Sequence, residues 1–246
     1  MALTLTASTN ATTKVTQLYV AMFGRAPDIE GLNFWGGAID GGQSVAKIAQ
    51  DMFATTPARA YFPTGATSQE IVQSFYVNVL GRQPDADGLA FWVARLDALK
   101  ATGNVNAVGQ VVTEIINIVT SYNGNNADGL ASARLFANKV EVSNFWVTEN
   151  GSAVNASKPI ELVTANADSV NQVKVQILNG FGNITLTLKE ASVGGVLQPI
   201  RLTGDTNNGG TIEKGFTTAG DDKIVAGRLE LLHQAYIDGG EGYNVL

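Results

Sequence analysis

Hydrophobic residues recur at helical spacing in two stretches of the chain, one before residue 24 and one before residue 81. Within each stretch the spacing is i, i+3, i+4, i+7 and i+8, which places the residues on one face of an α-helix. The pattern therefore predicts two amphipathic helices that bury one side. Their apolar residues are Val15, Leu18, Tyr19, Met22 and Phe23 in the first and Val72, Phe75, Tyr76, Val79 and Leu80 in the second.

The same turn motif, Gly-Arg-x-Pro-Asp, follows both predicted helices. Its glycine is expected to end the helix in a left-handed conformation, its proline cannot continue the helix, and its aspartate can accept backbone N–H bonds from a new helix. Gly-Leu-x-Phe-Trp comes next in both copies, and the two tryptophans, Trp35 and Trp92, are 57 residues apart. The structural turn and cap residues are Gly24, Pro27, Asp28, Gly81, Pro84 and Asp85.

Each copy continues into a third apolar helix, over residues 45–53 in the first and 108–119 in the second, where a few residues are inserted. A degenerate third copy is expected from Ala127, where Ala-Asp-Gly-Leu recurs, with Asn144-Phe145-Trp146 echoing the aromatic pair. A last helix is expected over residues 170–178. The sequence thus predicts a mainly α fold, with a helical repeat domain over residues 1–180.

Residues 181–246 have a different pattern, with short alternating segments between Gly, Asn, Thr and Asp. This pattern predicts a smaller β-rich segment. Two phrases, residues 220–224 and 237–246, are similar to calcium-binding repeats. The second fits the repeat of calcium-binding β-rolls, except that Asn244 stands where Asp is usual. Ordinary turns rich in Asp, Asn and Gly are the alternative interpretation. The candidate Ca²⁺ ligands are Asp221, Asp222, Asp238 and Asn244.

The doubled motif resembles a helical domain of unknown function that recurs in surface-layer proteins, adhesins and RTX calcium-binding proteins, which Gram-negative bacteria export by type I secretion. The resemblance covers residues 10–180, and residues 219–224 and 237–240 are similar to the onset of the calcium-binding region of the same proteins. It implies an N-terminal region at the cell surface, often on lipopolysaccharide, and a C-terminal lattice or adhesive stalk that depends on Ca²⁺. The 246 residues are then expected to be the first part of a longer protein.

Composition changes this picture only by exclusion. The chain has a net charge of −6, 15% charged residues and no cysteine, which excludes disulfides and thiolate metal sites. Its 16 basic residues are scattered among 22 acidic ones, so nucleic acid is not an expected partner. The first ten residues lack the features of a Sec signal peptide, and no apolar run predicts a transmembrane segment. An anionic glycolipid could still bind through bridging Ca²⁺.

Catalytic chemistry has few candidates in this sequence. The single histidine is His233, and no nucleophile elbow, phosphate loop or metalloprotease motif is present. The carboxylate pairs Asp28/Glu30 and Asp85/Asp87 could flank a glycosidic bond. Because the pairs recur where helices are predicted to start, they are better explained by favourable contacts with the helix dipole. The sequence predicts that the protein is not an enzyme.

Two interpretations apply to the aromatic and arginine residues of the motif. Trp35, Trp92, Tyr19 and Tyr76 could stack on sugar rings, or they could pack between helices, as their helical spacing favours. Arg25 and Arg82 could bind a glycan phosphate or carboxylate, or they could stabilise the adjacent turn.

The function that the sequence favours is the cell-surface anchor of a secreted surface-layer protein. In this hypothesis the helical domain binds outer-membrane lipopolysaccharide or another glycan, while downstream repeats self-associate into a calcium-dependent lattice. The main alternative is an interaction domain of an adhesin or RTX toxin. The second alternative is a surface glycan hydrolase that uses Asp85 and Asp87.

Overall fold

The structure, a computed structural model, describes residues 5–149, 152–178, 185–189, 199–205 and 223–226. These residues are mainly helical, as the sequence predicts. The chain divides into two units, residues 1–170 and 171–246. The boundary that the sequence predicts, at residue 180, lies outside the described residues.

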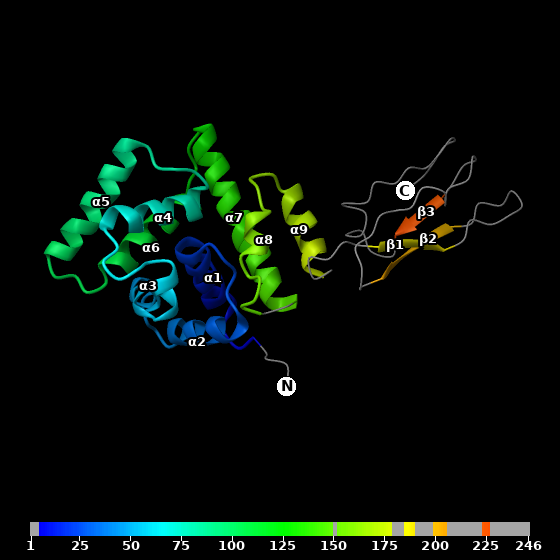
Figure 1. Cartoon of the computed structure of the whole chain (residues 1–246), viewed down its shortest axis with the longest axis horizontal. Coiled ribbons are helices and arrows are strands. Elements are labelled where there is room, and N and C mark those ends of the chain that lie inside the picture. The colour runs from blue at the N-terminus through cyan, green and yellow to red at the C-terminus, as the bar shows by residue number, and fades with distance from the viewer. Residues whose placement is uncertain (1–4, 150–151, 179–184, 190–198, 206–222, 227–246) are drawn as a thin grey trace, which may run out of the picture. The chain divides into compact units, whose positions relative to one another are not determined.

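The helices of the two predicted copies occur in the structure, which also has two short helices, over residues 57–60 and 158–161, that the sequence pattern does not predict. Figure 1 labels the α-helices. In chain order the helices are α1 (Thr9–Phe23), α2 (Ile29–Asp40), α3 (Val45–Ala54), the 3-10 helix η1 (Pro57–Ala60), α4 (Ser68–Leu80), α5 (Ala86–Ala101), α6 (Ala107–Thr120), α7 (Ala127–Glu149), α8 (Lys158–Glu161) and α9 (Asp168–Leu178).

Helix α1 is the centre of the helical unit. It contacts α2, α3, α4, α6 and α7, which surround it in Figure 1. Its residues Val15, Leu18 and Met22 are fully buried. The apolar face that the sequence predicts for this helix therefore forms the middle of the hydrophobic core.

The two copies of the repeat have the same order of elements, α1–turn–α2–α3 and α4–turn–α5–α6. They differ in the second helix, which has 12 residues in α2 and 16 in α5. The difference of 16 − 12 = 4 residues is about one helical turn. The insertion that the sequence shows in the second copy is thus an added turn of α5 together with one more residue in the link that follows it.

Helices α3 and α6, the third helices of the two copies, pack tightly against each other. Gly109 of α6 lies so close to the backbone of Ala46 and Gln50 that a Cβ atom at position 109 would collide with both. The Gln50 side-chain oxygen accepts hydrogen bonds from the N–H groups of Val108 and Gly109, at 3.1 and 3.2 Å. A residue of the first copy therefore caps the first turn of a helix in the second.

The third copy is present only as the start of a helix. Helix α7 runs without interruption to Glu149, so Phe145 and Trp146 lie near the end of a long helix and do not correspond to the aromatic pairs of the other copies. The physical reason is that no Gly-Arg-x-Pro turn precedes Ala127, because the preceding helix is α6 of the second copy. What is retained is the cap, since the Asn126 side-chain oxygen accepts the Gly129 N–H at 2.9 Å.

The C-terminal unit contains three described strands, β1 (Thr185–Lys189), β2 (Pro199–Asp205) and β3 (Lys223–Ala226). They form a sheet in the order β1-β2-β3, in which β1 pairs with β2 antiparallel and β2 with β3 parallel. The calcium-repeat phrases, with Asp221, Asp222, Asp238 and Asn244, lie outside the described residues, and β-roll repeats remain a prediction.

Candidate functional site

Both Gly-Arg-x-Pro-Asp turns have the backbone geometry that the sequence predicts. Gly24 and Gly81 are left-handed, with φ of 58° and 69°. The carboxylates of Asp28 and Asp85 each accept a backbone N–H at 2.7 Å, from Gly31 and Gly88 respectively. Pro27 and Pro84 lie between these glycines and caps in the two turns.

A tyrosine hydroxyl explains why glycine follows each cap three residues later. The hydroxyl of Tyr19 lies so close to Gly31 that a Cβ there would collide with it, and Tyr76 lies in the same way against Gly88. In the third helix start the corresponding glycine is Gly129, and it also lies against a tyrosine ring. That ring belongs to Tyr122, which comes from the segment before the cap instead of from a preceding helix.

Arg25 is held on three sides in the first turn. Its guanidinium lies over the Tyr19 ring at 4.8 Å, donates to the carbonyl oxygen of Ala26 at 3.0 Å and lies 3.4 Å from the second carboxylate oxygen of Asp28. The turn itself is fixed by a hydrogen bond from the Ala26 N–H to the carbonyl oxygen of Ala156. Arg25 thus performs the structural role that one interpretation of the sequence gives it.

Arg82 is placed less tightly than Arg25 although its local sequence is nearly the same. Its guanidinium is 3.7 Å from Asp85, and its side chain is 44% exposed, against 20% for Arg25. The two arginines that the sequence treats as equivalent therefore have different surroundings.

The two motif tryptophans also differ. Trp92 is 8% exposed and belongs to the hydrophobic core, as the packing interpretation predicts. Trp35 is only partly buried and, with Tyr19, lines the pocket described below. Burial is the main cause that raises the pKa of Tyr19 to about 12, and the nearby Asp28 carboxylate adds to it.

Arg25 and Trp35 line a pocket of about 230 Å³ in the helical unit. The pocket lies between α1, the first turn, α2, the end of α3 and the segment around η1. Four of its ten lining residues are aromatic, and two of these, Phe23 and Tyr61, are in ring contact at 5.0 Å. The lining residues are Tyr19, Phe23, Arg25, Asp28, Trp35, Met52, Thr55, Pro57, Ala58 and Tyr61. We call this the turn pocket.

Sequence patterns did not reveal the far wall of the turn pocket. Tyr61 lies in the link between α3 and α4, where no helical period applies, and the only local signal is the pair of prolines at 57 and 63.

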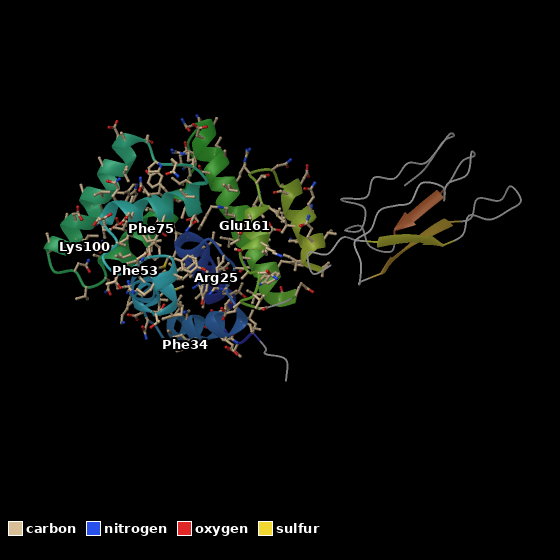
Figure 2. All side chains as sticks on the ribbon, viewed as in Figure 1. Arg25, Phe34, Phe53, Phe75, Lys100 and Glu161 are labelled. Atoms are coloured by element: carbon tan, nitrogen blue, oxygen red, sulfur yellow. The ribbon has the colours of Figure 1, made fainter. Side chains whose placement is uncertain are left out.

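In each Phe-Trp pair of the motif, the phenylalanine is the exposed residue. Phe34 is 68% exposed and Phe91 is 62% exposed. Figure 2 shows Phe34 at the outer edge of α2.

Two of the four carboxylates considered for catalysis cap the starts of helices. Asp85 accepts the Gly88 N–H, and this hydrogen bond is the largest of the effects that hold the pKa of Asp85 below its ordinary value. Asp28 has the same capping role in the first turn. Within the described residues, no three His, Cys, Asp or Glu side chains gather in a group that could hold a metal ion.

One segment of this architecture is similar to a known domain family. Residues 49–102 are similar to a domain family described as a domain of unknown function (DUF4214). The matched segment runs from within α3 through η1, α4 and the second turn to just past the end of α5. No curated protein and no solved structure gave a significant match. Among the described helices, none is both long enough and apolar enough to cross a membrane.

Proposed function

We propose that the helical unit is a non-enzymatic glycan-binding module, which anchors a secreted surface-layer protein to the lipopolysaccharide of its own outer membrane. Downstream repeats of the longer protein would then assemble a calcium-dependent lattice on the cell surface of a Gram-negative bacterium. The observation that carries the binding role is the turn pocket, where aromatic side chains surround an arginine and an aspartate.

The chemistry of the turn pocket suits a sugar. Phe23, Trp35 and Tyr61 offer apolar ring surface, and amphipathic aromatic residues are typical of recognition sites with one apolar and one wet side. Arg25 and Asp28 add a fixed donor and a fixed acceptor beside these rings. A mostly apolar concavity with a few convergent polar groups is the common form of a small-ligand site.

The carboxylates support a binding role over hydrolysis. A glycosidase needs one carboxyl group that is protonated at working pH and a second one that flanks the same bond. Asp85 instead accepts a backbone N–H that favours its ionised form, and an equivalent cap occurs at Asp28. These carboxylates therefore have a structural explanation that occurs in both copies.

Co-sedimentation with isolated lipopolysaccharide tests the proposal, with the repeat itself supplying matched controls. We expect Arg25→Ala to weaken saturable binding by about tenfold, the effect of one lost hydrogen bond to a charged group. Arg82→Ala should lower thermal stability slightly and leave binding unchanged, because Arg82 lies outside the turn pocket. Tyr61→Ala should also weaken binding, whereas Phe91→Ala, at another exposed ring, should not.

Calcium enters the same experiment as a separate variable. Loss of lipopolysaccharide binding in chelator would place Ca²⁺ in the binding mechanism. Absence of binding in both conditions would overturn the anchoring role. In that case an adhesin that recognises another cell would become the better hypothesis for this fold.

A further inference from the structure

The turn pocket combines a positive and a negative group at close range. Arg25 lies 3.4 Å from the outer carboxylate oxygen of Asp28, while the inner oxygen accepts the Gly31 N–H at 2.7 Å. A charge-assisted hydrogen bond is usually about 2.7–2.9 Å long, so this ion pair is loose. Arg25 also has five N–H donors, more than its contacts with Ala26 and Asp28 use. The pocket therefore offers an acceptor and a donor side by side.

This pair selects against charged ligands. A phosphate or carboxylate that approached Arg25 would also meet the Asp28 carboxylate, and a cation would meet the Arg25 guanidinium. A ligand with two adjacent hydroxyl groups avoids both penalties, because one hydroxyl donates to Asp28 while its neighbour accepts from Arg25. Such a ligand adds no net charge to the partly enclosed site.

The walls and size of the turn pocket limit the ligand further. Phe23, Trp35 and Tyr61 present ring surface suited to the C–H face of a sugar. The volume of about 230 Å³ is below the range of about 300–1,000 Å³ that is usual for sites of larger ligands. One six-membered ring fits this description better than an internal stretch of polymer, which favours the end of a chain or a single branch.

We infer that the turn pocket binds an uncharged terminal pyranose, with the Arg25–Asp28 pair holding two adjacent hydroxyl groups of the ring. This inference rests on the proposed glycan-binding function and specifies its ligand. It also makes the first turn functionally distinct from the second, whose Arg82 and Asp85 are more exposed and 3.7 Å apart.

The test measures the binding of monosaccharides to the full chain by ligand-observed NMR. The probes are the methyl glycosides of glucose, galactose and mannose, a deoxy analogue of the best binder that lacks one of its adjacent hydroxyls, glucuronate and glucose 1-phosphate. A neutral glycoside should bind saturably, its deoxy analogue about tenfold more weakly, and the two charged sugars should not compete. This readout does not depend on lipopolysaccharide binding.

Asp28→Asn is the decisive variant. Asparagine keeps the helix cap, as Asn126 shows by accepting the Gly129 N–H at 2.9 Å, but it removes the negative charge. We expect the variant to bind the neutral glycoside about tenfold more weakly and to gain binding of glucuronate or glucose 1-phosphate. Asp85→Asn makes the same change in the second turn. It should alter neither the binding of the neutral glycoside nor the binding of the charged sugars.

Three results would overturn the inference. They are preferential binding of a charged sugar by the native chain, an Asp28→Asn variant that behaves like the native chain, and no monosaccharide binding at all. If lipopolysaccharide still binds in any of these cases, the proposed function stands and only the ligand assignment fails. If a neutral glycoside binds but lipopolysaccharide does not, the pocket assignment stands and the anchoring role fails.

Discussion

At the residue scale, Tyr19 joins the parts of the first turn into one structure. Its hydroxyl lies against Gly31, and its ring lies under the Arg25 guanidinium at 4.8 Å. The repeated residues of the motif are therefore those that contact one another around a buried tyrosine. This arrangement gives a physical reason for their joint recurrence in the second copy, around Tyr76.

The raised pKa of Tyr19 predicts a loss of stability at alkaline pH. An unfolded tyrosine ionises near pH 10.0, whereas Tyr19 in the fold keeps its proton up to a pKa of about 12. Between these values the unfolded state binds fewer protons, so the free energy of unfolding falls as pH rises. The contribution of Tyr19 to the free energy of unfolding is fully present below pH 10. Its loss above that pH lowers the free energy of unfolding by about 2–3 kcal/mol.

Denaturant unfolding from pH 8 to pH 12, compared between the native chain and Tyr19→Phe, measures this effect. The variant should be less stable at pH 8, because it loses the hydroxyl contacts, and its stability should fall less between pH 10 and pH 12. Parallel curves for the two proteins would show that another group causes the alkaline loss.

At the element scale, the contact between α3 and α6 joins the two copies most closely. Gly109 allows this approach, since a side chain there would collide with the backbone of Ala46 and Gln50. The two repeated segments therefore do not fold as separate units along the chain. Their third helices share a backbone-to-backbone interface that depends on one residue without a side chain.

Gly109→Ala is expected to destabilise the helical unit by about 3 kcal/mol or more, because backbone atoms cannot move aside as a flexible side chain can. Gly37→Ala in α2 is the matched control, since nothing lies within 4 Å of its added Cβ. Alanine favours a helix over glycine, so this variant should gain about 0.5–1 kcal/mol. Urea denaturation, monitored by circular dichroism, measures the free energy of unfolding of both variants. A small loss for Gly109→Ala would mean that α3 and α6 can separate slightly without cost.

The helices and their caps could be predicted from the sequence because they depend on local interactions. The turn pocket could not, because it depends on contacts between residues that are far apart in the sequence. The apolar period, the glycines at 24 and 81 and the caps at Asp28 and Asp85 act within a few residues of the chain. Arg25 and Arg82 have similar neighbours in sequence, yet only the first turn has Tyr61 beside it and Ala156 bonded to it. Nothing in the repeated motif carries that information.

At the scale of the whole molecule, the helical unit and the C-terminal unit have different expected chemistry. The described residues of the chain contain no three-membered group of His, Cys, Asp or Glu that could hold a metal ion. The candidate calcium ligands all belong to the unit that begins at Asn171. Calcium binding, if the sequence motifs provide it, should therefore be separable from glycan binding.

Isothermal titration with Ca²⁺ checks this separation. The full chain should bind Ca²⁺, and Asp238→Asn should weaken that binding because it removes a charged oxygen ligand. A chain of residues 1–178 should bind none and should keep its melting temperature in chelator. Calcium-dependent melting of residues 1–178 would contradict the assignment of Ca²⁺ to the C-terminal unit.

The position of Gln50 has a consequence for synthesis of the chain on the ribosome. Its side chain accepts hydrogen bonds from the first N–H groups of α6, 58 and 59 residues further along, so α6 gains this cap only after Val108 and Gly109 have emerged. The segment that matches DUF4214, residues 49–102, ends before α6 begins and therefore contains only one half of this contact. We therefore expect residues 1–120 to fold together. The segment that folds as one unit is then longer than one 57-residue repeat of the sequence.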